Sequence, residues 1–338
     1  MTITSLEDLR GQLKALPGPD LKARTRAEER EPQLTKPPGS LGRLEDLSAW
    51  ISAWQGTHPP RMASPRARVF AGNHGVVAKG ISAYPQEVTQ QMVFGFEAGS
   101  AAINQLCKTF DIELQVTALD LDNPTKDFTE YPAMSEHEFV QAFNTGMDAV
   151  PDQTDLICLG EMGIGNTTSA AAICLALYGG TAADWTGAGT GVEGAAMDTK
   201  IHVVNEGVER HKAAIKDGLD ALQFLGGREL VAICGAIVKA RQNQIPVMID
   251  GFISTAAAAA LQASSPDALD HCQIAHASAE KGHKRLLAAV GKTPLLDMGM
   301  RLGEASGAAL AVGIVKAAVN CHVGMATFAE AGVSDKDD

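Results

Sequence analysis

Four short apolar runs, each followed by a loop and then by a stretch of helical character, constrain the fold of this chain most strongly. The runs are residues 67–71, 112–119, 155–159 and 245–249. The helical stretches after them are residues 85–106, 135–149, 168–177 and 253–263. Strands that alternate with helices predict a mostly parallel, Rossmann-like α/β sheet with helices on both faces. Ligands of such sheets bind outside the carboxyl ends of the strands, so we expect the site at that edge.

Composition and the remaining segments agree with this class. Apolar residues make up 45% of the 338 residues and aromatic residues only 5%, which favours small-residue helices packed closely on a sheet. The length predicts more than one domain. Residues 5–30 are charged and amphipathic and predict surface helices, which Pro17-Gly18-Pro19 interrupts. Residues 36–45 predict a rigid turn before a further helix, residues 300–319 a long C-terminal helix, and residues 335–338 a frayed tail.

Charge and cysteine usage exclude several classes of protein. The formal net charge of -12 argues against a broad nucleic-acid-binding surface, which needs clustered lysine and arginine. The first ten residues hold no apolar signal core, and no run of 18 apolar residues is free of charge or glycine. We therefore expect a cytoplasmic protein without a membrane partner. The cysteines form no C-x-x-C pair, which fits a reducing compartment: Cys107, Cys158, Cys174, Cys234, Cys272 and Cys321.

Glu304 is the residue that this sequence most favours as the catalytic group. It lies between Gly303 and Gly307, near Arg301, and is expected to open an almost wholly apolar helix. A carboxylate at a place where a helix packs into a core is costly unless something uses or neutralises it.

The loop from Gly160 to Thr168 is the best candidate for an anion site. Its glycines allow backbone N–H groups to turn inward, and the helix that follows, capped by Asn166 or Thr167, offers more donors. The loop matches neither a Walker A motif nor G-x-G-x-x-G, and an ordinary strand-to-helix turn remains the alternative. Glu161, in the same loop, fits helix stabilisation and a site role equally well.

Two further charged residues have open roles. Asp250 follows an apolar strand and fits either a helix cap or a carboxylate aimed into the crevice. Lys200 follows a glycine-rich loop, residues 187–194, and fits either a solvated lysine or a phosphate partner.

The histidines give no metal signal. His271, Cys272, His276 and His283 lie close in sequence, but no second cluster of ligands accompanies them. We therefore predict no metal and no other cofactor. The sequence leaves open the roles of these histidines and of His74, which follows the first strand.

Several of these segments together resemble one family, the nicotinate-nucleotide–dimethylbenzimidazole phosphoribosyltransferases of cobalamin lower-ligand synthesis. The matching segments follow the family's order along nearly the whole chain: residues 36–45, 72–76, 82–89, 160–168, 250–252, 278–282 and 301–307. The resemblance implies an α/β domain over residues 61–290. It also implies a small helical domain built from residues 1–60 and 291–338, the latter carrying the catalytic glutamate, and a homodimer.

The resemblance also implies a reaction and a set of site residues. The phosphoribosyl group of nicotinate mononucleotide would move to 5,6-dimethylbenzimidazole or a related base, with inversion at the anomeric carbon, and Glu304 would act as the base. The phosphate and ribose would be bound by Glu161, Gly163, Asn166, Thr167, Thr168, Lys200, Asp250, Arg301, Leu302 and Gly303. The acceptor base would lie against Tyr84, Pro85, Thr89 and Met92.

Two departures from the family pattern leave the acceptor open. Tyr84 and Met92 stand where a familiar member has serine and glutamine, so other benzimidazoles or a purine are alternatives. A protein that only binds these ligands, and a nucleosidase that uses water, are the competing functions.

Overall fold

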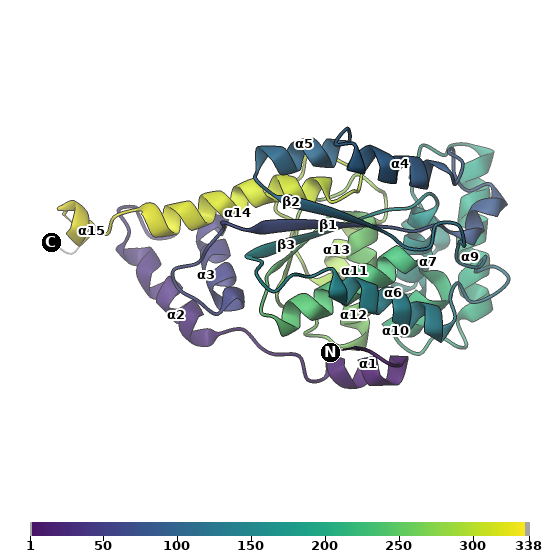
Figure 1. The fold of residues 1–338 in the computed structure, drawn as a ribbon, viewed down its shortest axis with the longest axis horizontal. Helices are drawn as coiled ribbons and strands as arrows, with labels where there is room; N and C mark the ends of the chain where they lie inside the picture. Colours follow the sequence, from purple (N-terminus) through teal and green to yellow (C-terminus); the bar gives the residue numbers. More distant parts are fainter. Residues whose placement is uncertain (1, 335–338) are drawn as a thin grey trace.

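One parallel sheet forms the centre of the protein in the computed structural model, which describes residues 2–334 (Figure 1). Within these residues the sheet has five strands in the order β2-β1-β3-β4-β5, and each neighbouring pair is parallel. The strands are β1 (Pro65–Ala71), β2 (Glu113–Ala118), β3 (Leu156–Met162), β4 (Val247–Ile249) and β5 (Cys272–Ile274). The predicted α/β class is confirmed. The chain order reverses between β1 and β3, the switch point at which ligands of such sheets bind.

Helices cover both faces of the sheet because side chains alternate along its buried strands. In β3, Ile157 packs into the core beneath α11 (Arg228–Gln242) and α12 (Phe252–Ser264), while Cys158 packs into a second core beneath α14 (Ser306–Gly324). Figure 1 shows α14 and α5 (Ala102–Thr109) on one side of the sheet and α11 and α12 on the other. Further helices on the α11 side are α6 (Glu136–Asp148), α7 (Asn166–Tyr178) and α10 (Gly218–Leu225).

Two predicted helices differ from those observed. The stretch 85–106 forms two helices, α4 (Val88–Glu97) and α5, because the chain turns at Gly99, whose φ is +75°. The predicted helix 300–319 starts only at Ser306, because Gly303, Glu304 and Ala305 all have positive φ. Glu304 therefore precedes this helix instead of opening it.

The sequence patterns also missed several elements. β5 has only three residues, too few for an alternation to be read. No helix was assigned to α8 (Ala182–Trp185), α9 (Ala195–His211), α10, α11 or α13 (His283–Val290). The predicted frayed tail, residues 335–338, lies outside the described residues.

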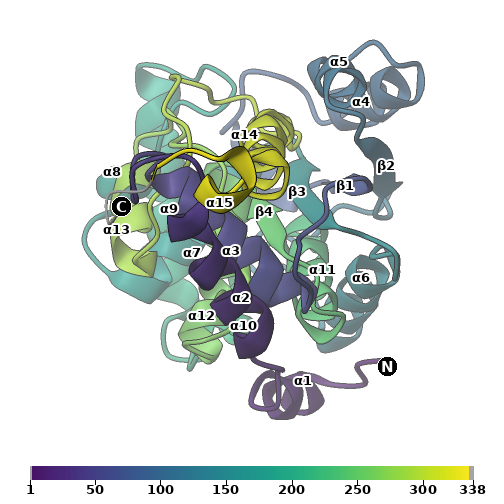
Figure 2. The same cartoon turned by 90° about the vertical axis from the view of Figure 1, so that its left-hand side faces the viewer.

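Segments from both ends of the chain pack together at one end of the molecule (Figures 1 and 2). Helices α2 (Leu21–Arg30) and α3 (Arg43–Gln55) lie beside the C-terminal half of α14, with the short turns η1 (Glu31–Gln33) and α15 (Phe328–Ala331) nearby. In contrast, α1 (Leu6–Leu13) lies against the α/β body, where Arg10 pairs with Asp217 and Asp220. The assignment of all of residues 1–60 to one small domain stays a prediction.

The turn at residues 36–45 is held by buried charge pairs. The Lys36 ammonium lies 3.0 Å from Glu31 Oε2 and 2.7 Å from Glu45 Oε1. Arg43 donates to the carbonyl oxygens of Thr293 and Pro294, which connects this turn to the segment that leads into Arg301. Residues 36–45 therefore connect the N-terminal part of the chain to its C-terminal part.

Helix α14 is long and apolar enough to cross a membrane by length and composition alone. Its buried side, however, packs on β3 and β4 and against α3 and α5. In this fold it serves as a core helix of the sheet.

The contact between α6 and α11 depends on glycine, and this gives a testable prediction. A Cβ at Gly146 would overlap the carbonyl oxygen of Ala232. We expect Gly146→Ala to lower the free energy of unfolding by about 1–3 kcal/mol, because the two helices must separate. The measurement is the midpoint of denaturant unfolding.

Gly11→Ala in α1 is the matched control. A Cβ there would meet no atom within 4 Å, so the same substitution should raise the free energy of unfolding by roughly 0.5–1 kcal/mol. Equal effects of the two substitutions would contradict the packing argument.

Candidate active site

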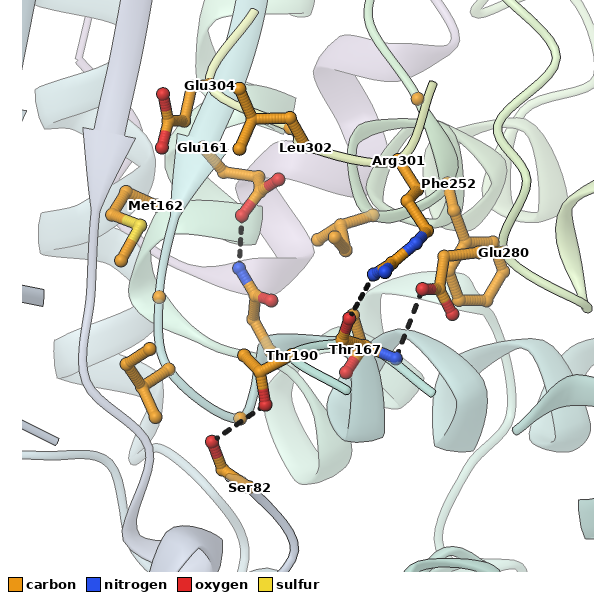
Figure 3. A pocket seen from close by; sticks show the side chains of 18 of the residues that line it. Ser82, Glu161, Met162, Thr167, Thr190, Phe252, Glu280, Arg301, Leu302 and Glu304 are labelled. Atoms are coloured by element: carbon orange, nitrogen blue, oxygen red, sulfur yellow. Dashed lines mark hydrogen bonds between the residues drawn. The ribbon is translucent and has the colours of Figure 1, made fainter. Parts of the chain in front are cut away.

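A cavity of about 460 Å³ lies at the carboxyl edge of the sheet. Its walls come from the loop between β3 and α7, from residues just after β4 and β5, from the segment 81–92 after β1, and from residues 301–304 before α14. Figure 3 shows Glu304 and Glu161 at one end of it and Arg301 with Glu280 at the other. Segments that are far apart in sequence thus meet where the fold predicts a ligand site.

Most of the site residues predicted from the sequence line this cavity. Those that line it are Tyr84, Met92, Glu161, Gly163, Asn166, Thr167, Arg301, Leu302, Gly303 and Glu304. Those that lie outside the lining are Pro85, Thr89, Thr168, Lys200 and Asp250. Thr89 supports the wall from behind, because its Oγ1 accepts the Ile164 N–H at 3.1 Å.

The start of α7 presents backbone donors to the cavity. The N-cap is Gly165, with φ +92°, and it has no side-chain cap, so the expectation that Asn166 or Thr167 caps this helix is wrong. Asn166 instead uses its side-chain Nδ2 to donate to Glu161. A helix N-terminus without a side-chain cap attracts an anion through its N–H groups and its dipole.

Glu304 lies in the cavity wall in a left-handed backbone conformation, with φ +62°. Its N–H donates to the carbonyl oxygen of Glu161 in β3 at 3.1 Å. Only 4% of the residue is exposed, and burial raises the pKa of its carboxyl to about 7. Glu304 can therefore exchange a proton near neutral pH.

Glu161 differs from Glu304 in its surroundings, because it lies among other carboxyls and accepts a hydrogen bond from Asn166. Burial, followed by the nearby carboxyls of Glu229 and Asp250, raises the pKa of Glu161 well above its usual range. The hydrogen bond from Asn166 opposes this shift but does not cancel it. Glu161 therefore holds its proton more tightly than an ordinary glutamate does.

Three charged side chains hold the glycine-rich loop 187–191 beside the cavity. Arg301 donates to the Gly189 carbonyl oxygen at 2.9 Å, and the Gly189 N–H donates to Glu280 Oε1 at 3.1 Å (Figure 3). Lys200 donates to the Gly187 carbonyl oxygen at 3.0 Å and to Thr167 Oγ1 at 2.8 Å. Burial lowers the pKa of Lys200 to about 8, which leaves most of this lysine protonated at pH 7 behind the α7 terminus.

The same loop crosses to the opposite wall. Thr190 Oγ1 lies 3.2 Å from Ser82 Oγ and accepts the Ala83 N–H at 3.1 Å (Figure 3). These contacts connect the loop 187–191 to the segment in front of α4.

Sequence reasoning missed several residues of the lining. They are Ile81, Ser82, Val88, Met162, Thr190, Phe252, Ile253, His276, Ser278 and Glu280. Ser278 and Glu280 follow β5, the strand that was not predicted, and the segment 278–282 was noted only as one that matches the family, without a site role.

The histidines have separate environments. His74 lies between Glu229 Oε1, at 2.5 Å from its Nε2, and Ser169 Oγ, at 3.0 Å from its Nδ1, and all three are buried. Burial lowers the pKa of His271 to about 3 and that of His283 to about 3, so both are neutral core residues. Within residues 2–334, no group of three or more histidine, cysteine, aspartate or glutamate side chains is arranged to hold a metal ion.

Comparisons with known proteins point to one family. The family model described as phosphoribosyltransferase matches residues 16–333. The chain is 58% identical, over 98% of both sequences, to the nicotinate-nucleotide–dimethylbenzimidazole phosphoribosyltransferase of Ruegeria pomeroyi. It is 55% identical to the enzyme of the same name from Rhizobium leguminosarum bv. trifolii, over the full length of both. The crystal structure of the Thermus thermophilus enzyme is similar, with a TM-score of 0.86, 36% identity, and coverage of 94% of this chain and 99% of the other.

The raised pKa of Glu304 gives a prediction for stability against pH. The unfolded chain releases this proton near pH 4.5 and the folded chain near pH 7, so ionised Glu304 destabilises the fold above pH 7. This loss of stability is absent below pH 4.5 and grows as the pH rises from 4.5 to 7. We expect Glu304→Gln to unfold at a higher denaturant concentration than the wild type at pH 8 and at the same concentration near pH 4.

Asp297→Asn, at an exposed carboxyl of the same segment, is the charge-matched control. A difference between Glu304→Gln and the wild type that is equal at both pH values would contradict the burial argument.

Proposed function

Because the chain belongs to the nicotinate-nucleotide–dimethylbenzimidazole phosphoribosyltransferase family, we propose that it transfers the phosphoribosyl group of nicotinate mononucleotide to 5,6-dimethylbenzimidazole. The products are α-ribazole 5′-phosphate and nicotinate. The observation that carries the proposal is the pairing, in one cavity, of the uncapped α7 terminus with a buried carboxyl whose pKa is about 7.

The chemistry needs only one proton-transfer group. The bond between the anomeric carbon and the pyridinium nitrogen breaks, its electron pair stays on nitrogen, and nicotinate leaves with an uncharged ring that needs no acid. A ring nitrogen of the benzimidazole attacks the anomeric carbon with its lone pair. The other ring nitrogen then loses its proton. Attack opposite the leaving group inverts the anomeric centre from β to α.

Glu304 is the proposed base for that proton. A carboxylate with a pKa near 7 is a stronger acceptor than an ordinary glutamate and is still about half ionised at neutral pH. Glu161, at the same end of the cavity, already accepts a hydrogen bond from Asn166 and lies among carboxyls that raise its pKa. Of these two carboxyls, Glu304 therefore suits the role.

The proposed phosphate site is the N-terminus of α7. The backbone of Gly163–Thr167 and the α7 dipole supply anion-binding donors, and protonated Lys200 stands behind Thr167. Arg301, at the edge of the same wall, adds a second positive charge. In this arrangement Lys200 acts through Thr167 instead of touching the phosphate.

The acceptor ring is placed against apolar side chains. Those on the wall are Ile81, Tyr84, Val88, Met92, Met162 and Leu302. Such a surface suits a dimethylated aromatic ring, because it offers dispersion contacts without unpaired polar groups. From the family resemblance alone, we also propose that the chain acts as a cytoplasmic homodimer.

One assay tests the reaction. Purified protein is mixed with nicotinate mononucleotide and dimethylbenzimidazole, nicotinate and α-ribazole phosphate are separated chromatographically, and the anomeric configuration is read by NMR. Adenine and phenols, used in place of the benzimidazole, test the acceptor wall. Binding of both substrates without nicotinate release would support a binding protein, and release without any acceptor would support a nucleosidase.

The base assignment gives a separate prediction. Glu304→Gln keeps the size and the neutral hydrogen-bonding character of the side chain but cannot accept the proton, so turnover should fall roughly 10²–10⁴-fold. Binding of nicotinate mononucleotide, measured by calorimetry, should persist.

Glu206→Gln, on the exposed side of α9, is the control and should keep wild-type turnover. Wild-type turnover in Glu304→Gln would remove Glu304 from the proposed mechanism.

A further inference from the structure

The turn that carries Glu304 is strained and needs support from other elements. Three successive residues have positive φ: Gly303 at +85°, Glu304 at +62° and Ala305 at +60°. Two of them carry a Cβ, and each such residue costs on the order of 1–3 kcal/mol. Ala305 is also the N-cap of α14, and its methyl group cannot accept a hydrogen bond from the helix. The conformation therefore persists only because neighbouring elements hold it.

Asp250 supplies the missing cap from a different element. It follows β4, and its Oδ1 accepts the Ala308 N–H at 2.9 Å. Burial raises the pKa of Asp250 to about 7, and the nearby backbone N–H groups of Ala308, Gly307 and Ala305 oppose this shift. Asp250 Oδ1 thus takes the place of a side-chain cap on α14, while Asp250 Oδ2 is buried and has no hydrogen-bond partner among the described residues.

We propose that Asp250 is a positioning residue, which fixes the left-handed turn 303–305 and thereby aims the Glu304 carboxyl into the cavity. This inference rests on the proposed function of Glu304 as the base. It differs from what the family resemblance implies, in which Asp250 binds the substrate itself.

The surroundings of Asp250 favour support over substrate binding. The residue is 1% exposed and lies outside the cavity lining, behind Gly251. Its other polar neighbour is His276, whose Nε2 lies 3.6 Å from Asp250 Oδ1. His276 does line the cavity and is packed tightly, because a Cβ at Gly307 would overlap its ring. The side chain of His276 thus lies between the cavity and Asp250.

Two substitutions separate positioning from binding. Asp250→Ala removes the acceptor, and we expect kcat to fall about 10²-fold while KM for nicotinate mononucleotide stays near the wild-type value, since displacement of a catalytic group by about 1 Å has this effect. Asp250→Asn keeps one oxygen for the Ala308 N–H, so it should fold and recover part of kcat. An unchanged kcat in both variants, or a raised KM with unchanged kcat, would overturn the proposal.

A double-mutant cycle with Glu304→Gln tests whether Asp250 acts through Glu304. Asp250→Asn should cause little further loss of turnover in the Glu304→Gln background, because there is no base left to misplace. Losses that multiply in the double variant would show an independent role and contradict the inference.

A control and a structural measurement complete the test. Asp217→Ala removes the cap of α10, whose Asp217 accepts the Asp220 N–H, and should lower stability without lowering kcat. If the wild-type protein forms no α-ribazole phosphate, the proposed function fails; the crystal structure of Asp250→Asn still tests the inference, which requires an altered 303–305 turn. An unaltered turn would overturn it.

Discussion

The site depends on one close contact, the packing of the segment before α14 on strand β3. Gly160 lies under Ala305 so closely that any side chain there would overlap the Ala305 backbone. The Glu304 N–H completes the contact by donating to the Glu161 carbonyl oxygen at 3.1 Å. This contact joins parts of the chain that are more than a hundred residues apart, and it brings Glu304 to the edge at which the strands end. Without it the cavity would lose one wall and the proposed base together.

Buried carboxyls at this edge differ in their hydrogen-bond partners. Glu229 has His74 beside it, Asp250 accepts the Ala308 N–H, and Glu161 receives one amide hydrogen bond among other carboxyls. Glu304 has burial alone as the cause of its raised pKa. A carboxyl without a fixed partner has the freedom to take and release a proton during a reaction, while the others are committed to holding the structure.

The sequence predicted what local patterns encode and missed what tertiary contacts decide. β1 to β3 and the helices α6, α7 and α12 follow from apolar runs and periodicity, and Glu304 was singled out because a carboxylate in an apolar segment is costly. The left-handed turn at Glu304 and Ala305 was not predictable, because neither residue type favours positive φ. For Asp250 the sequence left a helix cap and a crevice carboxylate open, and it did not indicate that α14 is the helix it caps, since a cap that follows another strand leaves no spacing pattern. Glu280 was noted only within the family-matching segment 278–282 and was not assigned to the site, because the strand before it, β5, was not predicted.

Two helix N-termini meet at the carboxyl edge of the sheet, and their different caps divide the proposed chemistry. The α14 terminus donates its Ala308 N–H to Asp250 and is thus capped within the protein. The α7 terminus has no side-chain cap, and Lys200 lies behind it, so its N–H groups are available to a ligand anion. In the proposed function the phosphate therefore binds at α7, and its sugar extends toward the turn before α14. The inference for Asp250 then explains why α7 would bind the substrate while the α14 terminus would hold the base.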